Sequence, residues 1–376
     1  MTPSQLDPSP GPTITLEGFR STRYFPALDG LRCFSIAAVI WHHCTPRQLD
    51  GIAGRGHLGV RLFFCISGLL ITTLLLREQR VRGSIDLVRF WIRRSLRIFP
   101  LYYTVLALFT LFALSLPETS AQRTHFIGNL PFFLCHTSNW FIDYDVTHPV
   151  LFGFAWSLST EEQFYLMLPI LVKCLPSRAT LTFMLLAVIA IDQLAEHHHL
   201  TLILPRHSRA EIIVTSFMAS IGFGALLALG LEDPKWFARL RPALGQWFSA
   251  PLCLGVIFVW LIWPPREFVL FEAALALFVA ACALGSQYGL PRAFASKPLC
   301  HVGRVSYGMY LFHVPVIGAL RIVLPSIAQR ATILFPLSFL GTALLATLSH
   351  RTFEALFLSL RPDSRRVPAN VSGAAT

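Results

Sequence analysis

The sequence predicts an all-α, polytopic integral membrane protein with about ten transmembrane helices and both termini in the cytoplasm. Of its 376 residues, 54% are hydrophobic and only 14% are charged, and the mean hydropathy is +0.58. Soluble domains carry about 25% charged residues, so this chain has too few to cover a globule of its size. Apolar stretches separated by short basic segments are typical of a membrane protein.

Ten apolar segments come close to the length of about 17–25 residues that a spanning helix needs. They lie at residues 27–45, 58–76, 98–116, 153–173, 179–195, 210–230, 246–263, 267–285, 304–324 and 332–353. The stretch at 130–141 is shorter and aromatic, so we expect an interfacial or re-entrant segment there. We interpret the helices at 247–263 and 268–283 as a lipid-facing scaffold.

Basic loops predict the orientation. The connection 77–97 holds two acidic residues and seven arginines, which are Arg77, Arg80, Arg82, Arg89, Arg93, Arg94 and Arg97. Short loops rich in Arg and Lys stay in the cytoplasm, and the tail at 361–366 is basic as well. The same clustering explains the net charge of +11 without a nucleic-acid partner. Ten helices with both termini inside are consistent with these loops.

The chain divides into three expected parts. Residues 1–22 are rich in proline and lack a cleavable signal, so we expect a disordered cytoplasmic tail. A transmembrane domain then covers 23–355, and a short basic cytoplasmic tail covers 356–376.

The eight cysteines form no CxxC pair or zinc pattern, so we expect no metal site. The histidines at 197–199 are interpreted as a solvated loop, because consecutive residues point in different directions.

The first segment carries two ionisable residues, Arg32 and His43. Eleven helical steps of about 100° make three turns plus about 20°, so both side chains share one face, about 16 Å apart along the axis. Such groups are costly in a spanning helix and mark functional sites. A snorkelling interfacial Arg32 and a satisfied interior His43 are the ordinary alternatives. Asp29 lies on the same face as Arg32, so we expect a local ion pair.

The second segment is rich in small residues. Gly56, Gly59 and Gly68 allow close backbone approach, and Ser67 can form a hydrogen bond across helices. Helix packing is the simplest interpretation of this pattern. We expect Arg61, near the outer end, to lie at the membrane interface.

Three arginines precede the third segment. Arg93 and Arg97 have i,i+4 spacing and Arg94 and Arg97 have i,i+3 spacing, so their guanidinium groups are predicted to converge. Arg binds phosphate oxygens in bidentate fashion, which favours a site for a phosphorylated ligand. A purely topological role for these charges is the alternative.

Two later segments carry polar residues. Ser159 and Glu162 have capping-box spacing, which predicts a helix start there, and the adjacent Glu161 and Gln163 exceed what a cap requires. A carboxylate at this place could orient His43 or bind a sugar hydroxyl. In the ninth segment Ser306, Tyr310 and His313 share a face, and a buried, hydrogen-bonded His313 is the ordinary interpretation.

Five sequence blocks, in this order, resemble the membrane acyltransferase 3 family. They are YFPALDGLRCFSIAAVIWHH, GHLGVRLFFCISGLLIT, FWIRRSLRIFPLYY, WSLSTEEQFYL and VGRVSYGMYLFHVPV, between residue 24 and about residue 353. The resemblance implies an integral membrane enzyme that moves an acyl group, usually acetyl, from cytoplasmic acyl-CoA. The implied acceptor is a hydroxyl of an extracytoplasmic or cell-surface carbohydrate. Acyl-CoA is then a donor substrate, and no bound cofactor is implied.

The family's motifs fall on named positions. Its Arg-x10-His motif falls on Arg32 and His43, and its Arg-x-x-Arg motif falls on Arg94 and Arg97. The resemblance makes His43, Arg32 and Glu162 candidate catalytic residues and Arg93, Arg94 and Arg97 candidate acyl-CoA-binding residues. The candidate supporting residues are Asp29, Ser67, Gly68, Trp156, Gln163 and His313.

The chain departs from the family pattern in three places. Arg61 stands where many members have Asp, and His42 stands at a site more often aromatic, which leaves open which histidine acts. No further domain follows the tenth segment, so we expect no acyl relay to such a domain within this chain.

The expected mechanism has two forms, in which His43 is either the general base for a sugar hydroxyl or the nucleophile that carries the acyl group. One rival class is a transporter or flippase for a carbohydrate or lipid-linked substrate, and another is a receptor that does not turn over acyl-CoA. Inverted repeats would favour a transporter, and none is visible in the sequence. The expected partners are acyl-CoA, a surface carbohydrate or lipid-linked sugar, and the lipids of the inner or plasma membrane. The identity of the acceptor, the acyl length and the oligomeric state are left open.

Overall fold

A computed structural model describes residues 14–45, 51–142, 150–175, 177–196, 208–216, 218–263, 268–285, 288–327 and 329–362. These residues form helices and turns and contain no strand, which confirms the all-α class. The elements are α1 (Leu16–Ser21), α2 (Pro26–Cys44), η1 (Ile52–Leu58), α3 (Gly59–Arg82), α4 (Leu87–Ser115), α5 (Ala121–Leu134), α6 (Ser138–Phe141), η2 (Gly153–Ala155), α7 (Trp156–Cys174), α8 (Arg178–Glu196), α9 (Arg209–Thr215), α10 (Ala219–Glu232), α11 (Pro234–Leu244), α12 (Ser249–Ile262), α13 (Phe268–Leu284), α14 (Gly289–Phe294), α15 (Lys297–Val323), α16 (Ala331–Arg351) and α17 (Phe353–Ser359).

Every predicted apolar segment coincides with a helix, although 210–230 is divided between α9 and α10. Within the described ranges, five helices are long and apolar enough to span a membrane, and the α11–α12 pair, bent by 73°, would make a sixth. These five are Ala53–Arg82, Leu87–Ser115, Arg209–Glu232, Lys297–Val323 and Ala331–Ser359. The polytopic character is therefore supported, whereas the count of ten and the orientation of the termini stay predictions. The stretch at 130–141 falls in the short helices α5 and α6.

The ends of the chain differ from the expectation of plain tails. Residues 16–21 form α1 instead of disordered chain, because Phe19 is fully buried and Arg20 pairs with the buried Glu232, 3.4 Å away. At the other end, 353–359 form α17, so the tail predicted for 356–376 begins inside a helix. Residues 1–13, 197–207 and 363–376 lie outside the described residues, and so do the histidines at 197–199.

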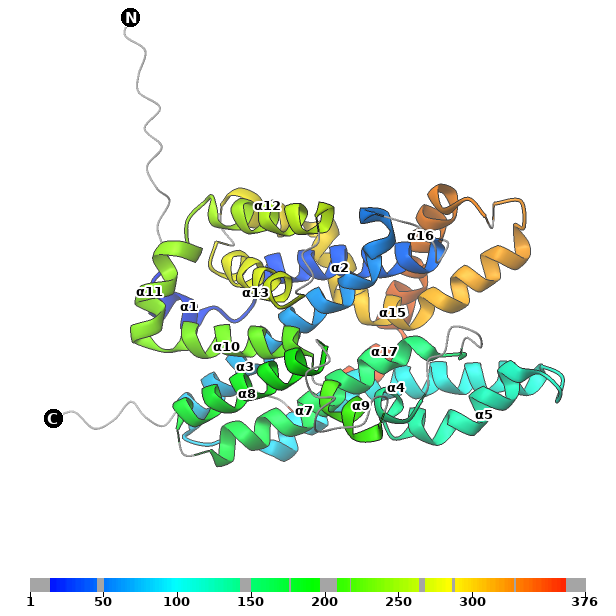
Figure 1. Ribbon diagram of the computed structural model, residues 1–376, viewed down its shortest axis with the longest axis horizontal. Helices are drawn as coiled ribbons and strands as arrows, with labels where there is room; N and C mark the ends of the chain where they lie inside the picture. The colour runs from blue at the N-terminus through cyan, green and yellow to red at the C-terminus, as the bar shows by residue number, and fades with distance from the viewer. Residues whose placement is uncertain are drawn as a thin grey trace, which may run out of the picture.

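Figure 1 shows two layers of helices, with α2, α12, α13, α15 and α16 in one and α4, α5, α7 and α8 in the other. Helix α3 runs from one layer to the other and packs along α10, while α2 packs along α15. Gly68 and Gly224 permit the first of these crossings, because a Cβ on Gly68 would collide with the Ile221 carbonyl and one on Gly224 with the Cys65 carbonyl. The helix-packing interpretation of Gly68 is thus confirmed.

One further prediction is wrong. Helix α13 is not a lipid-facing scaffold, because most of its residues are buried, including Glu272, whose exposed fraction is 0%. Glu272 forms an ion pair with Arg61 of α3 and accepts a hydrogen bond of 2.6 Å from Ser220. The position of Arg61 at the membrane interface stays a prediction.

The predicted helix start at the Ser159 capping box is also wrong. Helix α7 begins at Trp156, after the turn of η2 and the left-handed Phe152, whose φ is 62°. The Ser159 hydroxyl lies within the first turn and bonds instead to Ser138, at 2.8 Å. The earlier start places Glu161 and Glu162 inside the helix, where their side chains face other helices.

Candidate active site

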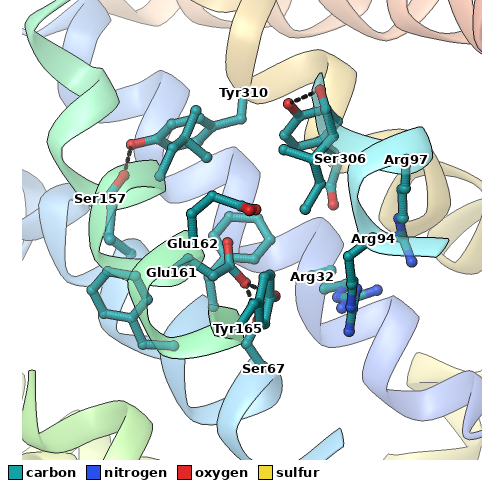
Figure 2. A pocket seen from close by; sticks show the side chains of 16 residues that line it. Arg32, Ser67, Arg94, Arg97, Ser157, Glu161, Glu162, Tyr165, Ser306 and Tyr310 are labelled. Atoms are coloured by element: carbon teal, nitrogen blue, oxygen red, sulfur yellow. Dashed lines mark hydrogen bonds between the residues drawn. The ribbon is translucent and has the colours of Figure 1, made fainter. Parts of the chain in front are cut away.

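Side chains from α2, α3, α4, α7 and α15 line a cavity that we call the arginine cavity (Figure 2). Its charged lining residues are Arg32, Arg94, Arg97, Glu161 and Glu162. Figure 2 shows the arginine side chains on one side and the two carboxylates of α7 across from them. Residues far apart in the sequence are therefore brought to one place.

Helix α4 presents Arg94 and Arg97 to this cavity from successive turns. The Asp86 carboxylate caps the helix by accepting a hydrogen bond of 3.0 Å from the Arg89 backbone N–H. The Arg94 guanidinium lies over the Tyr165 ring, 4.5 Å from its centroid. In the described ranges, no carboxylate lies within 4 Å of the guanidinium of Arg94 or Arg97. Two cations that line a cavity and have no carboxylate within 4 Å are suited to bind an anionic ligand.

Arg32 differs from these two arginines because it has a carboxylate neighbour. Its Nη1 lies 3.6 Å from Asp29 Oδ1, which confirms the expected local ion pair. Asp29 in turn accepts a hydrogen bond of 2.6 Å from the Tyr24 hydroxyl. Arg32 is therefore partly neutralised and held in place at the edge of the arginine cavity.

The two carboxylates of α7 have different surroundings. Glu161 accepts hydrogen bonds from the Ser67 and Tyr165 hydroxyls, so it joins α3 to α7 across the cavity. Glu162 lines the arginine cavity and does not line the cavity that contains His43. The structure thus places Glu162 with the arginines, in a different cavity from His43. The sequence analysis treats Glu161 only as a residue beyond what a helix cap requires. Ser67 of α3, whose hydroxyl donates a hydrogen bond to Glu161, is the polar residue in the sequence that could have pointed to its role.

Two predicted site residues lie elsewhere. Arg93 does not line the cavity and pairs with Glu78, 3.4 Å away, so it is not one of the arginines that face the cavity. The Gln163 amide donates to the His136 carbonyl and bonds with Asn139, at 2.9 Å in each case. Gln163 therefore fastens the α5–α6 turn to α7.

A second cavity, which we call the histidine cavity, contains His43. It is lined by Val39, His42, His43, His57, Val60, Arg61, Phe154, Trp156, Met218 and Tyr310. The His43 Nδ1 lies 2.9 Å from the Val39 carbonyl oxygen, which can only accept a hydrogen bond. Nδ1 must therefore carry the hydrogen, and Nε2 of the neutral ring carries the lone pair. This is the form of imidazole that acts as a base or a nucleophile.

His313 supports His43 directly. The two rings are 4.6 Å apart between centroids and nearly perpendicular, at 76°. His313 Nδ1 donates to the Tyr310 carbonyl at 2.5 Å, which fixes the same tautomer as in His43. The His313 Nε2 is buried without a hydrogen-bond partner among the described residues. The buried His313 was expected, but its edge-to-face contact with His43 follows only from the packing of α15 on α2.

The two cavities adjoin one another. Val60 and Tyr310 line both of them, from α3 and α15 respectively. The Tyr310 hydroxyl is 2.6 Å from the Ser157 hydroxyl (Figure 2). It also donates to the Phe154 carbonyl at 3.0 Å, so two contacts hold this residue, which lines both cavities. Anion-binding groups on one side of this pair and a basic imidazole on the other make a site that can bind an anionic donor and abstract a proton. Within the part of the chain that the structure describes, no cluster of three metal-ligating side chains occurs.

Comparison with known proteins decides the family. The family model described as an acyltransferase domain, Acyl_transf_3, matches residues 25–351. The chain belongs to the acyltransferase 3 family. It is similar to O-acetyltransferase OatA of Staphylococcus aureus strain NCTC 8325, with 28% identity over 362 residues that cover 90% of this chain and 58% of OatA. It is similar as well to peptidoglycan O-acetyltransferase OatA of Listeria monocytogenes, with 29% identity over 359 residues that cover 89% of this chain and 56% of OatA.

The acyltransferase 3 chain thus spans little more than half the length of these relatives. No solved structure matches it. The blocks that carry the family resemblance line the two adjoining cavities, because α2, α3, α4, α7 and α15 each contribute to at least one of them. The family's sequence motifs and the cavities therefore identify the same region of the molecule.

Proposed function

We propose that this chain is a membrane-bound O-acyltransferase that moves an acyl group from cytoplasmic acyl-CoA to a carbohydrate hydroxyl. One observation carries the proposal. Arg94 and Arg97 line a cavity without a carboxylate within 4 Å in the described ranges, and this cavity adjoins the one that contains His43. A transferase needs this pairing of a donor site and a basic group.

The arginine cavity is the proposed donor site. Coenzyme A carries a diphosphate and a ribose 3′-phosphate, and guanidinium groups bind phosphate oxygens through two parallel hydrogen bonds. Arg94 and Arg97 are free of competing ion pairs in the described residues, so they are the principal phosphate ligands. Arg32 contributes less, since Asp29 neutralises part of its charge. The basic loop at 77–97 makes the cytoplasm the side from which the donor enters.

The histidine cavity is the proposed site of transfer. The lone pair on His43 Nε2 takes the proton of the acceptor hydroxyl while the hydroxyl oxygen attacks the thioester carbonyl. The C–S bond then breaks, and the leaving thiolate of CoA takes a proton from the imidazolium. Alternatively, Nε2 attacks the thioester carbonyl, and the C–S bond breaks to release CoA as its thiolate. The acyl group on the imidazole then passes to the acceptor hydroxyl, whose proton goes to the thiolate. Both routes use the same lone pair.

The acceptor is proposed to be a glycan of the cell envelope, and the acyl group to be acetyl. Support comes from the relatives, whose names give O-acetyl transfer and, in one case, peptidoglycan. The apolar helices place the enzyme in a membrane, for which we propose the plasma or inner membrane. Membrane lipids are then its immediate partners.

Label transfer tests the proposed function. The full chain, purified in lipid nanodiscs, is incubated with [1-14C]acetyl-CoA and soluble peptidoglycan fragments, and the release of CoA thiol is measured in parallel. We expect label in the carbohydrate that mild alkali removes, as from an ester. If neither CoA release nor labelled carbohydrate is detected, the proposal is wrong.

A further inference from the structure

Arg361 lies beyond the last helix, in a basic tail that the sequence explains by topology alone. The structure places it beside α4, because α17 packs against that helix and Arg361 follows α17 after one turn. We propose that Arg361 binds a phosphate of the acyl-CoA donor, and specifically the ribose 3′-phosphate. This inference rests on the proposed function, because it names a further residue of the same donor site.

Several cations surround Arg361. Its guanidinium interacts electrostatically with Arg93, Arg94 and Arg97. Burial first, and then Arg94 and Arg93, lower the pKa of the Arg361 guanidinium from its ordinary value. Like charges that are held together repel one another, and an anion between them removes this cost. The arrangement is therefore unfavourable in the free protein and favourable around a phosphate.

The hydrogen bonds of Arg361 point to the same ligand. Its Nε is buried and has no hydrogen-bond partner in the described part of the chain. No carboxylate there lies within 4 Å of its guanidinium, and the nearby Glu354 is already paired with Ser349 and His350. A buried N–H without an acceptor costs free energy, which an incoming phosphate oxygen would recover.

The position of Arg361 selects which phosphate it meets. Arg94 and Arg97 line the arginine cavity, whereas Arg361 does not. The thioester end of the donor must enter the cavity to reach His43, so the nucleotide end stays nearest to the basic end of the molecule. We assign the diphosphate to Arg94 and Arg97 and the more distant 3′-phosphate to Arg361.

A comparison of two ligands tests this assignment. Binding of CoA and of 3′-dephospho-CoA to the full chain in nanodiscs is measured by titration calorimetry. We expect Arg361→Gln to raise the Kd for CoA by about tenfold or more and to leave the Kd for 3′-dephospho-CoA within about twofold, since a hydrogen bond to a charged group is lost from one complex only. Arg94→Gln should raise the Kd for both CoA and 3′-dephospho-CoA.

Controls separate this role from general charge and from folding. Arg351→Gln removes an exposed cation from the end of α16 and should change neither Kd, and Arg361→Lys should restore part of the CoA affinity. Thermal unfolding of each variant reports on folding. If Arg361→Gln weakens neither ligand, or weakens both equally, the inference is wrong. If the wild-type protein binds neither ligand, the proposed function fails as well.

Discussion

The arginine cavity and the histidine cavity are both lined by arginines. Arg61 of the histidine cavity is paired with a carboxylate, whereas among the described residues Arg94 and Arg97 of the arginine cavity are not. In the histidine cavity the buried Glu272 neutralises Arg61, so the charge of Arg61 stabilises the fold. In the arginine cavity Arg94 and Arg97 have no carboxylate within 4 Å in the described ranges, so their charge is available to a ligand. The pairing of a cation, rather than its presence, therefore distinguishes a structural arginine from a ligand-binding one.

The largest expected effect comes from the histidine cavity. His43→Ala should lower the rate of acetyl transfer by about 10²–10⁴-fold, the usual contribution of a positioned general base, with little change in the affinity for acetyl-CoA. The rate is measured as labelled acetyl ester formed per enzyme under saturating donor. His42→Ala serves as the comparison and should lose far less activity, because His43 and not His42 is the ring in edge-to-face contact with His313. If His42→Ala were as inactive as His43→Ala, the assignment of the general base to His43 would be contradicted.

Stability should separate the two kinds of arginine. Arg61→Leu leaves the carboxylate of Glu272 buried without its guanidinium partner, and breaking a buried pair costs about 3–5 kcal/mol. Arg94→Leu breaks no ion pair among the described residues and should leave the unfolding temperature unchanged or slightly higher. Thermal unfolding in the same nanodiscs measures both. Equal destabilisation by the two substitutions would contradict the comparison.

Substitutions of two arginines on α4 should differ in their effect on the KM for acetyl-CoA. Arg97→Ala should raise the KM for acetyl-CoA by about tenfold or more, since a hydrogen bond to a charged group is worth about 1.5–3 kcal/mol. Arg89, about two turns earlier, pairs with Asp86 at 3.7 Å and provides a matched control on the same helix. An unchanged KM in Arg97→Ala would remove this residue from the donor site.

The smallest expected effect is at Arg93. The sequence groups it with Arg94 and Arg97, but the structure pairs it with Glu78, so Arg93→Ala should change the KM for acetyl-CoA by less than about threefold, as expected for a partly exposed ion pair. Steady-state kinetics with varied donor concentration measures it. A loss as large as that of Arg97→Ala would show that the sequence-based grouping was the better guide.

Local spacing accounts for what the sequence predicts well. The Asp29–Arg32 pair and the neighbouring turns of Arg94 and Arg97 follow from helical geometry within one segment. The all-α class follows from composition. These features depend only on residues that are close in the sequence.

Long-range packing accounts for what the sequence misses. Arg61 and Glu272 are 211 residues apart, and Ser157 and Tyr310 are 153 apart, so no local pattern shows that they meet. The capping-box prediction at Ser159 is wrong because the turn at η2 starts α7 three residues earlier. Glu162 lines the arginine cavity and not the histidine cavity, which the spacing within its own segment does not show.

The central claim is that the two adjoining cavities divide the work, with donor binding at the arginines and transfer at His43. Equilibrium binding of CoA to His43→Ala and to the Arg94→Ala/Arg97→Ala double variant tests it most directly. The account predicts a wild-type Kd for His43→Ala and a Kd raised by about tenfold or more for the double variant. Loss of CoA binding in His43→Ala, or wild-type binding in the double variant, would contradict it.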